Sequence, residues 1–171
     1  MNFALLTVSD RSASGEREDR SGPALKELIE RQGWYVSEQI IVPDERDKIE
    51  AQLREWADGG SIDVILTTGG TGFAPRDITP EATSSVIDRA APGLAEAMRL
   101  ASLGKTPHAM LSRAVAGIRG CTLIINLPGS PRGARENLQA IMQVLPHAVD
   151  LLRDEPGAEA GHRDLPPVQH I

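Results

Sequence analysis

One stretch of the sequence, residues 62–81, constrains the fold more than any other, because it joins an apolar run to a glycine turn and then to a helix start. The run 62–68 is rich in β-branched and apolar residues, which is typical of a buried strand. It stops at the glycine-rich run 69–72, where positive φ angles and a close approach of a ligand to the backbone are both possible. Thr79 and Pro80 then predict an N-cap and the first position of a helix. The stretch therefore predicts a strand-to-helix loop that holds an anion, with a plain tight turn as the alternative.

The rest of the chain alternates strand-like and helix-like segments. Strands are expected at 3–8, 35–42, 62–68 and 121–127, and helices at 22–31, 44–57, 79–89, 92–102 and from 131 to about 153; residues 103–120 stay unassigned except for a short helical turn at 109–113. This alternation predicts βαβ units with right-handed crossovers. The fold class is therefore α/β, with a mostly parallel central sheet flanked by helices. The tail 154–171 has no periodicity and is expected to be an arm or disordered.

Composition narrows the function classes. The 171 residues suffice for one domain with a full core. A net charge of −6, with only two Trp, one Tyr and two Phe, argues against a nucleic-acid partner. No apolar stretch approaches the ~20 residues that cross a bilayer, and the first residues lack a signal-peptide layout, so we expect a cytoplasmic protein without a membrane partner. The single cysteine, Cys121, opens an apolar strand and is expected to be a buried structural thiol.

The predicted loops at the carboxyl ends of the strands carry most of the polar chemistry. They contain Ser9-Asp10-Arg11 through Asp19-Arg20-Ser21-Gly22, Pro43-Asp44-Glu45, Gly69 to Thr79, and Asn126-Leu127-Pro128-Gly129-Ser130-Pro131-Arg132. Because ligands of open parallel sheets bind beyond these strand ends, we expect the loops to converge on one edge. Helix starts at Thr79-Pro80 and Ser130-Pro131 would point backbone N–H groups there, which suits phosphate. Neither a P-loop nor a dinucleotide fingerprint is present, so the expected phosphate site is of another kind.

Two carboxylates stand out at this edge. Asp44 and Asp77 lie in separate loops, and a pair of carboxylates beside phosphates can hold Mg²⁺ while the ion keeps several waters. For Asp44 alone the favoured alternative is an N-cap of the helix that follows it. Asp77 has no such alternative, because Thr79 already supplies a cap. Arg76 is expected to contact phosphate or to form a salt bridge at the helix edge. Hydrolytic sites are less favoured, since the chain has no G-x-S-x-G elbow and no His/Cys metal cluster.

Several loop motifs, in order, resemble the MogA/MoaB proteins and the G domain of gephyrin. They are Ser9-Asp10-Arg11 with Gly15, Pro43-Asp44-Glu45, Thr67-Thr68-Gly69-Gly70-Thr71-Gly72, Arg76-Asp77-x-Thr79-Pro80-Glu81-Ala82-Thr83, Met110-Leu111-Ser112-Arg113, and Asn126-Leu127-Pro128-Gly129-Ser130-Pro131. The resemblance covers residues 3–153 and implies a three-layer α/β sandwich, with 1–153 as one molybdopterin-binding domain. Members of this family are molybdopterin adenylyltransferases, which use Mg-ATP to place AMP on the molybdopterin phosphate and release pyrophosphate.

The resemblance also implies roles for individual residues. Asp44 and Asp77 would be the catalytic, Mg²⁺-binding aspartates, with ATP as co-substrate. The substrate-binding set would be Ser9, Asp10, Thr68, Gly69, Gly70, Thr71, Gly72, Ser112, Asn126, Pro128, Gly129 and Ser130. The expected partners are molybdopterin, ATP and a molybdate-inserting protein, and the expected assembly is a homotrimer or a hexamer with residues 92–115 at the interface. Two alternatives remain, a catalytically silent pterin-binding protein and a nucleotide hydrolase that uses the same phosphate loops.

Overall fold

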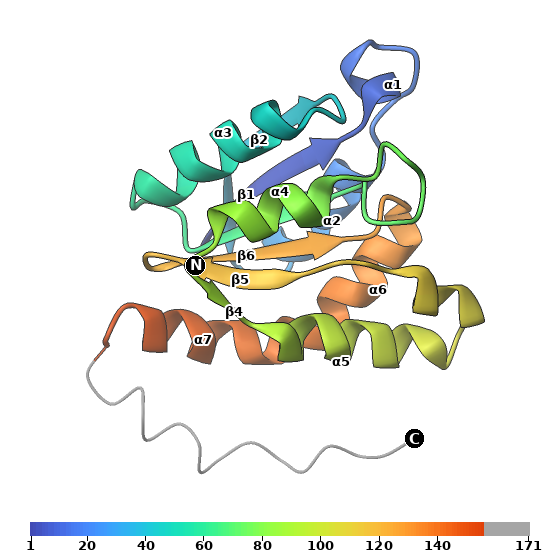
Figure 1. Cartoon of the computed structure of the whole chain (residues 1–171). Helices are drawn as coiled ribbons and strands as arrows, with labels where there is room; N and C mark the ends of the chain where they lie inside the picture. The colour runs from blue at the N-terminus through green and yellow to red at the C-terminus, as the bar shows by residue number, and fades with distance from the viewer. Residues whose placement is uncertain (156–171) are drawn as a thin grey trace.

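The computed structural model describes residues 1–155 and contains one six-stranded sheet (Figure 1). The strands are β1 Asn2–Val8, β2 Tyr35–Val42, β3 Val64–Thr68, β4 Arg89–Ala90, β5 Ala116–Arg119 and β6 Thr122–Leu127. The helices are α1 Asp10–Ala13, α2 Ser21–Glu30, α3 Arg46–Asp58, α4 Thr79–Val86, α5 Pro92–Leu103, α6 Pro131–Ile141 and α7 Leu145–Leu152, with 3-10 turns η1 Pro107–Leu111 and η2 Met142–Val144. Of the predicted tail 154–171, only the first two residues fall within the described part of the chain.

The strand order is β2-β1-β3-β6-β5-β4, and the first four strands are mutually parallel. Thr7 of β1 lies beside Thr68 of β3, which lies beside Leu127 of β6, so three strands end at the same level. Their following loops therefore leave from one edge of the sheet. The prediction of a mostly parallel sheet is confirmed.

Two apolar clusters, one on each face of the sheet, make the core. Alternation along β1 sends Phe3 and Leu5 to one cluster and Ala4 and Leu6 to the other. The first cluster packs against α2, α5, α6 and α7, and the second against α3 and α4, which Figure 1 shows lying over the sheet. Helix, sheet and helix layers give the expected three-layer α/β sandwich.

The antiparallel edge of the sheet is where the sequence-based expectations were wrong. β5 lies inside the unassigned stretch and joins β6 through a turn at Gly120, whose φ is +55°. Cys121 belongs to this turn and is exposed, so the prediction of a buried thiol is wrong. The expected long final helix is instead divided at residues 142–144, because Pro146 in the first turn of α7 lacks the N–H that a continuous helix would use. Within residues 1–155, no helix combines the length and the apolar character that crossing a membrane takes.

Candidate active site

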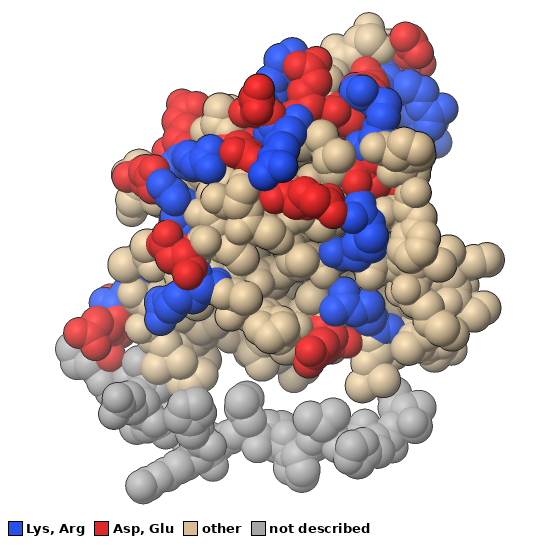
Figure 2. Space-filling view, viewed as in Figure 1, with Lys and Arg blue, Asp and Glu red and all other residues tan. Residues whose placement is uncertain are grey.

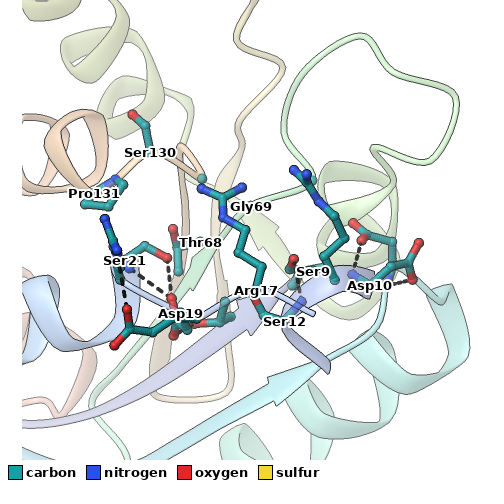
Figure 3. Close-up of a pocket in the computed structure, with 18 of the residues that line it drawn as sticks. Ser9, Asp10, Ser12, Arg17, Asp19, Ser21, Thr68, Gly69, Ser130 and Pro131 are labelled. Carbon is teal, nitrogen blue, oxygen red and sulfur yellow. Dashed lines mark hydrogen bonds and ion pairs between the residues drawn. The ribbon is translucent and has the colours of Figure 1, made fainter. Parts of the chain in front are cut away.

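A cavity of about 500 Å³ opens at the carboxyl edge of the parallel strands (Figure 3). The loops after β1, β2, β3 and β6 all line it, which confirms that they converge. Of the residues proposed from the sequence, it brings together Ser9, Asp10, Asp44, Thr68, Gly69, Gly70, Asp77, Gly129 and Ser130. The hydroxyl of Ser130 accepts a hydrogen bond from the Gly133 N–H at 3.1 Å, so this residue caps α6 and aims the start of that helix at the cavity.

The glycine turn, Gly69-Gly70, forms the floor of the cavity. Gly69 has a φ of +101°, and a Cβ on it would lie 2.2 Å from the carbonyl oxygen of Val8. Gly70 has a φ of +63°, and its Cβ would lie 2.4 Å from the Thr79 hydroxyl oxygen and 3.3 Å from Asp44 Oδ1. Only glycine fits either position without strain. The Asp44 carboxylate therefore lies directly over a backbone turn that is bare of side chains.

Thr79 ties the glycine turn to α4. Its hydroxyl donates to the Gly69 carbonyl at 2.9 Å and its N–H to the Gly70 carbonyl at 3.1 Å. The N-cap of α4 is Ile78, without a side-chain cap, so the prediction that Thr79 caps the helix is wrong. The hydroxyl instead fixes the strand-to-helix loop.

Asp10 and Asp44 exchange hydrogen bonds between two loops. The Asp10 N–H donates to Asp44 Oδ2 at 2.7 Å, and the Asp44 N–H donates to Asp10 Oδ1 at 3.0 Å. The N-cap of α3 is Glu45, so Asp44 is not the cap that was favoured for it from the sequence. Burial raises the pKa of the Asp44 carboxyl against a lowering by the Asp10 N–H, and the nearby Asp10 and Asp77 carboxylates also raise it.

The Asp77 arm, residues 72–78, follows the glycine turn. Asp77 Oδ2 accepts the Ala74 N–H at 2.8 Å, and a Cβ on Gly72 would lie only 2.8 Å from that same oxygen. Gly72 has no positive φ, so its role is space for the carboxylate rather than backbone shape. Arg76 reaches back to the Asp10 carboxylate at 2.6 and 2.9 Å and to the Asp44 carbonyl at 3.0 Å. The salt-bridge alternative for Arg76 is the one that the structure contains.

A second cavity, of about 310 Å³, lies on the other side of the glycine loop, between η1, α5 and α6. It holds the remaining proposed residues except one: Thr71, Gly72, Ser112 and Pro128, together with Ser130, which lines both cavities. The two cavities thus meet at the glycine loop and at the start of α6. Such a pair of neighbouring cavities fits a reaction between two substrates.

The sequence from residue 4 to residue 147 matches the model of the family described as "Probable molybdopterin binding domain". The chain belongs to this molybdopterin-binding-domain family.

Individual similar proteins support the same family. The chain is 45% identical over 157 residues to the molybdopterin adenylyltransferase of Helicobacter pylori strain J99, covering 89% of this chain and 88% of the relative. It is 46% identical to the molybdenum cofactor synthesis protein cinnamon of Drosophila melanogaster, where 91% of this chain spans only 26% of the relative. The solved structure of the molybdopterin biosynthesis enzyme MoaB from Thermus thermophilus superimposes with a TM-score of 0.85 at 54% identity, covering 91% of this chain and 98% of that one.

Asn126 is the proposed substrate-binding residue that the structure does not bring to either cavity of this molybdopterin-binding domain. Its side chain is fully buried and donates to the hydroxyls of Thr67 at 2.9 Å and Thr83 at 2.8 Å, while its Oδ1 accepts the Val115 N–H at 3.3 Å. All three contacts are internal. Asn126 therefore joins β6 to its neighbours beneath the site.

Arg17 and Asp19 line the first cavity but were not singled out from the sequence. Figure 3 shows Arg17 extending across the cavity toward Gly69. The Asp19 carboxylate accepts the N–H and hydroxyl of Ser21, both at 2.9 Å, and the hydroxyl of Thr7 at 2.7 Å. The sequence analysis placed this loop among those that carry polar and charged residues at the carboxyl ends of the strands. All five residues at 16–20 are charged, with both signs mixed, so the sequence gave no sign of which side chain turns inward.

The pair Asp44 and Asp77 fits Mg²⁺ only as an incomplete ligand set. Residues 1–155 contain no group of three or more His, Cys, Asp or Glu side chains that could hold a metal ion. Mg²⁺ commonly takes one or two carboxylates and completes its shell with water and substrate phosphates. Two carboxylates that line one cavity with the glycine turn meet that pattern when a phosphate is bound.

Proposed function

We propose that this protein is a molybdopterin adenylyltransferase of molybdenum cofactor biosynthesis, with Mg²⁺ held by Asp44 and Asp77. An oxygen of the molybdopterin phosphate attacks the α-phosphorus of ATP, and the bond from that phosphorus to the bridging oxygen breaks, so that pyrophosphate leaves with the electron pair. The products are adenylyl-molybdopterin and pyrophosphate. The observation that carries the proposal is that Asp44 and Asp77 line one cavity with the glycine turn, in a chain similar along most of its length to a named molybdopterin adenylyltransferase.

The arrangement of the two cavities suits this reaction. The phosphates of both substrates would meet at the glycine turn, between the hollow lined by Asp44 and the one lined by Ser112. Little covalent chemistry is needed from the protein, because the reaction depends on in-line positioning and on stabilising charge. Bound Mg²⁺ would neutralise charge on the transferring phosphoryl group. The Gly69-Gly70 backbone and the α6 N-terminus would hold the phosphate oxygens.

The deciding experiment is AMP transfer from Mg-ATP to molybdopterin by the purified protein. We expect adenylyl-molybdopterin and pyrophosphate in equal amounts, and no product when EDTA removes the divalent cation. Binding of molybdopterin without ATP binding would favour the catalytically silent pterin-binding protein. AMP release in the absence of pterin would favour a nucleotide hydrolase.

We also propose that the protein assembles as a homotrimer in the cytoplasm and passes its product to a molybdate-inserting protein. The apolar side chains of Leu100, Met110 and Phe73 are 73%, 67% and 67% exposed. Figure 2 shows that the end of the molecule where η1 lies is almost free of charged side chains on this face. Ala95, Met98 and Ala109, also expected at the interface, are buried in the subunit itself. Sedimentation as a monomer at micromolar concentration would overturn the oligomer, and a mass twice that of a trimer would favour the hexamer.

A further inference from the structure

The Asp77 arm has few contacts of its own that could hold its carboxylate in place. Phe73 is 67% exposed and residues 73–76 are all exposed. Within the arm, the only backbone hydrogen bond runs from the Asp77 N–H to the Ala74 carbonyl at 2.9 Å, and it closes a local turn without fixing that turn to the domain. Arg76 links the middle of the arm to the Asp10 carboxylate and the Asp44 carbonyl. The carbonyls at the two ends of the arm are bound from outside it.

Arg113 contacts both ends of the arm. Its Nε donates to the Gly72 carbonyl at 2.6 Å, and its terminal nitrogens donate to the Asp77 carbonyl and to the Glu81 carboxylate. Its own N–H donates to the Thr71 carbonyl at 3.0 Å. One residue thus binds the carbonyls that open and close the arm and joins them to the first turn of α4.

The base of Arg113 is itself braced. Arg99 of α5 donates to the Ala114 carbonyl at 2.9 Å, directly beside Arg113 in the chain. The Arg113 side chain is about one-third exposed, and it lies on the α4 side of the arm, where it lines a separate shallow hollow with Pro80 and Glu81. It lines neither of the two cavities assigned to substrates. Its contacts are therefore those of a brace rather than of a substrate ligand.

We propose that Arg113 is a positioning residue that sets the Asp77 carboxylate at its distance from Asp44. The inference rests on the proposed adenylyl transfer for its kinetic consequence, and on the hydrogen bonds alone for its structural one. A guanidinium presents several N–H groups in one rigid plane, so it can span the two carbonyls and the carboxylate at once. A lysine ammonium is a single point of charge on a flexible stem and would reach one of them.

The variants Arg113→Ala and Arg113→Lys test this, with Arg119→Ala as the matched control. Arg119 also donates to a carboxylate, Asp58, and to a carbonyl, Val86, and is comparably buried, but it lies in β5 away from both cavities. We expect kcat to fall about tenfold to a hundredfold in both Arg113 variants, with the KM for ATP little changed, because misplacement of a catalytic group acts on the transition state. The Mg²⁺ concentration for half-maximal rate should rise. Millimolar guanidinium chloride should restore part of the rate to Arg113→Ala.

Hydrogen exchange of the arm separates this proposal from the proposed function. In Arg113→Ala, the hydrogen-bonded amides of Ala74 and Asp77 should exchange faster than in the wild type, while Arg119→Ala leaves them unchanged. This holds whether or not the wild type transfers AMP, so an inactive wild type would refute the adenylyltransferase and leave the brace intact. Unchanged exchange in Arg113→Ala, or a kcat loss no greater than that of Arg119→Ala in an active enzyme, would overturn the role of Arg113.

Discussion

The two parts of the glycine loop are held in different ways. The glycine turn is fixed by the backbone: its φ angles are positive, the Gly69 N–H donates to the Leu127 carbonyl at 3.3 Å, and the Val8 carbonyl lies against Gly69. Thr79 binds two of the turn's carbonyls. The Asp77 arm is held by side-chain contacts: Arg113, from outside the arm, binds its two ends, and Arg76, within the arm, binds Asp10. The glycine turn, which would bind phosphate, is held directly by the ends of the sheet strands. The arm, which carries the Asp77 carboxylate, is held by side-chain hydrogen bonds that single substitutions can remove.

Within the eleven residues 69–79, one part of the loop therefore matters mainly for folding and the other mainly for catalysis. A change in the turn must disturb β1, β3 and β6 together, because the turn lies between their ends. A substitution in the arm affects exposed residues and a few hydrogen bonds. Substitutions in the turn should therefore mainly lower the free energy of unfolding. Substitutions in the arm should mainly lower the rate of catalysis.

The largest expected effect is that of Gly69→Ala. Its Cβ would lie 2.2 Å from the Val8 carbonyl oxygen, inside the central sheet, at a φ of +101°. We expect the free energy of unfolding to fall by about 3 kcal/mol or more, or the protein not to fold. The matched control is Gly33→Ala, at a φ of +75° with no atom within 4 Å of the new Cβ, which should cost about 1 kcal/mol. Equal losses in urea unfolding would show that the contact with Val8 does not fix the turn.

Next come the two carboxylates. Asp77→Asn should leave the free energy of unfolding nearly unchanged and raise the activation barrier by about 3 kcal/mol, since a metal contact at the reacting phosphate is lost. Asp44→Asn should lower the rate similarly. Asp47→Asn, on the exposed first turn of α3, serves as the control in the same adenylylation assay. Wild-type rates in both variants would remove the metal pair from the mechanism.

Gly72→Ala should have an intermediate effect, with thermal stability largely kept and the catalytic rate reduced. Its Cβ would press on Asp77 Oδ2, which can move, and its backbone needs no positive φ. We expect thermal unfolding within a few degrees of the wild type and a rate lower by about tenfold. Calorimetric titration with Mg-ATP and with molybdopterin should show weaker binding of at least one of them. If the melting temperature falls as far as in Gly69→Ala, the arm is part of the cooperative folding unit.

The smallest expected effect is a pH response confined to the arm. The Arg76 guanidinium lowers the pKa of the Asp10 carboxyl below its usual range. A depressed pKa means that the ion pair is complete at neutral pH and is lost only as pH falls through the lowered value. Hydrogen exchange corrected for intrinsic rates should show the arm equally protected from neutral pH down to the usual carboxyl pKa of about 3.9 and loosened only below it, with the glycine turn unaffected. In Asp10→Asn the arm should be loosened already at neutral pH.

The sequence predicted those parts of the molecule that depend on near neighbours in the chain. Strands β1, β2, β3 and β6 have continuous or alternating apolar patterns, and the glycine turn has a composition that few other structures need. The antiparallel edge escaped prediction because β4 has two residues and β5 has four, one of them Gly117, so neither shows a period. β5 exists through its pairing with β6, and β4 through its pairing with β5, and no local pattern encodes either contact.

The sequence predicted which loops meet at the cavity better than it predicted the hydrogen bonds of single residues. Asp44 follows a proline before a helix, as a cap would, and only the approach of Asp10 from a loop 34 residues away gives it another use. Asn126 was assigned to the substrates, but its amide faces three internal partners that lie on other elements. Arg113 was part of a matched motif, and its contacts to carbonyls 36 and 41 residues away could not be inferred from spacing.

The exposed Cys121 has a practical consequence for work on this protein. It is the single cysteine, and it precedes β6, whose other end leads into the cavity. At about 3.3 Å per strand residue, the thiol lies roughly 20 Å from the glycine turn. A maleimide dye would therefore attach at one known place without entering the site. In the proposed oligomer, energy transfer between dyes on different copies would then follow subunit exchange in real time, on the unaltered natural sequence.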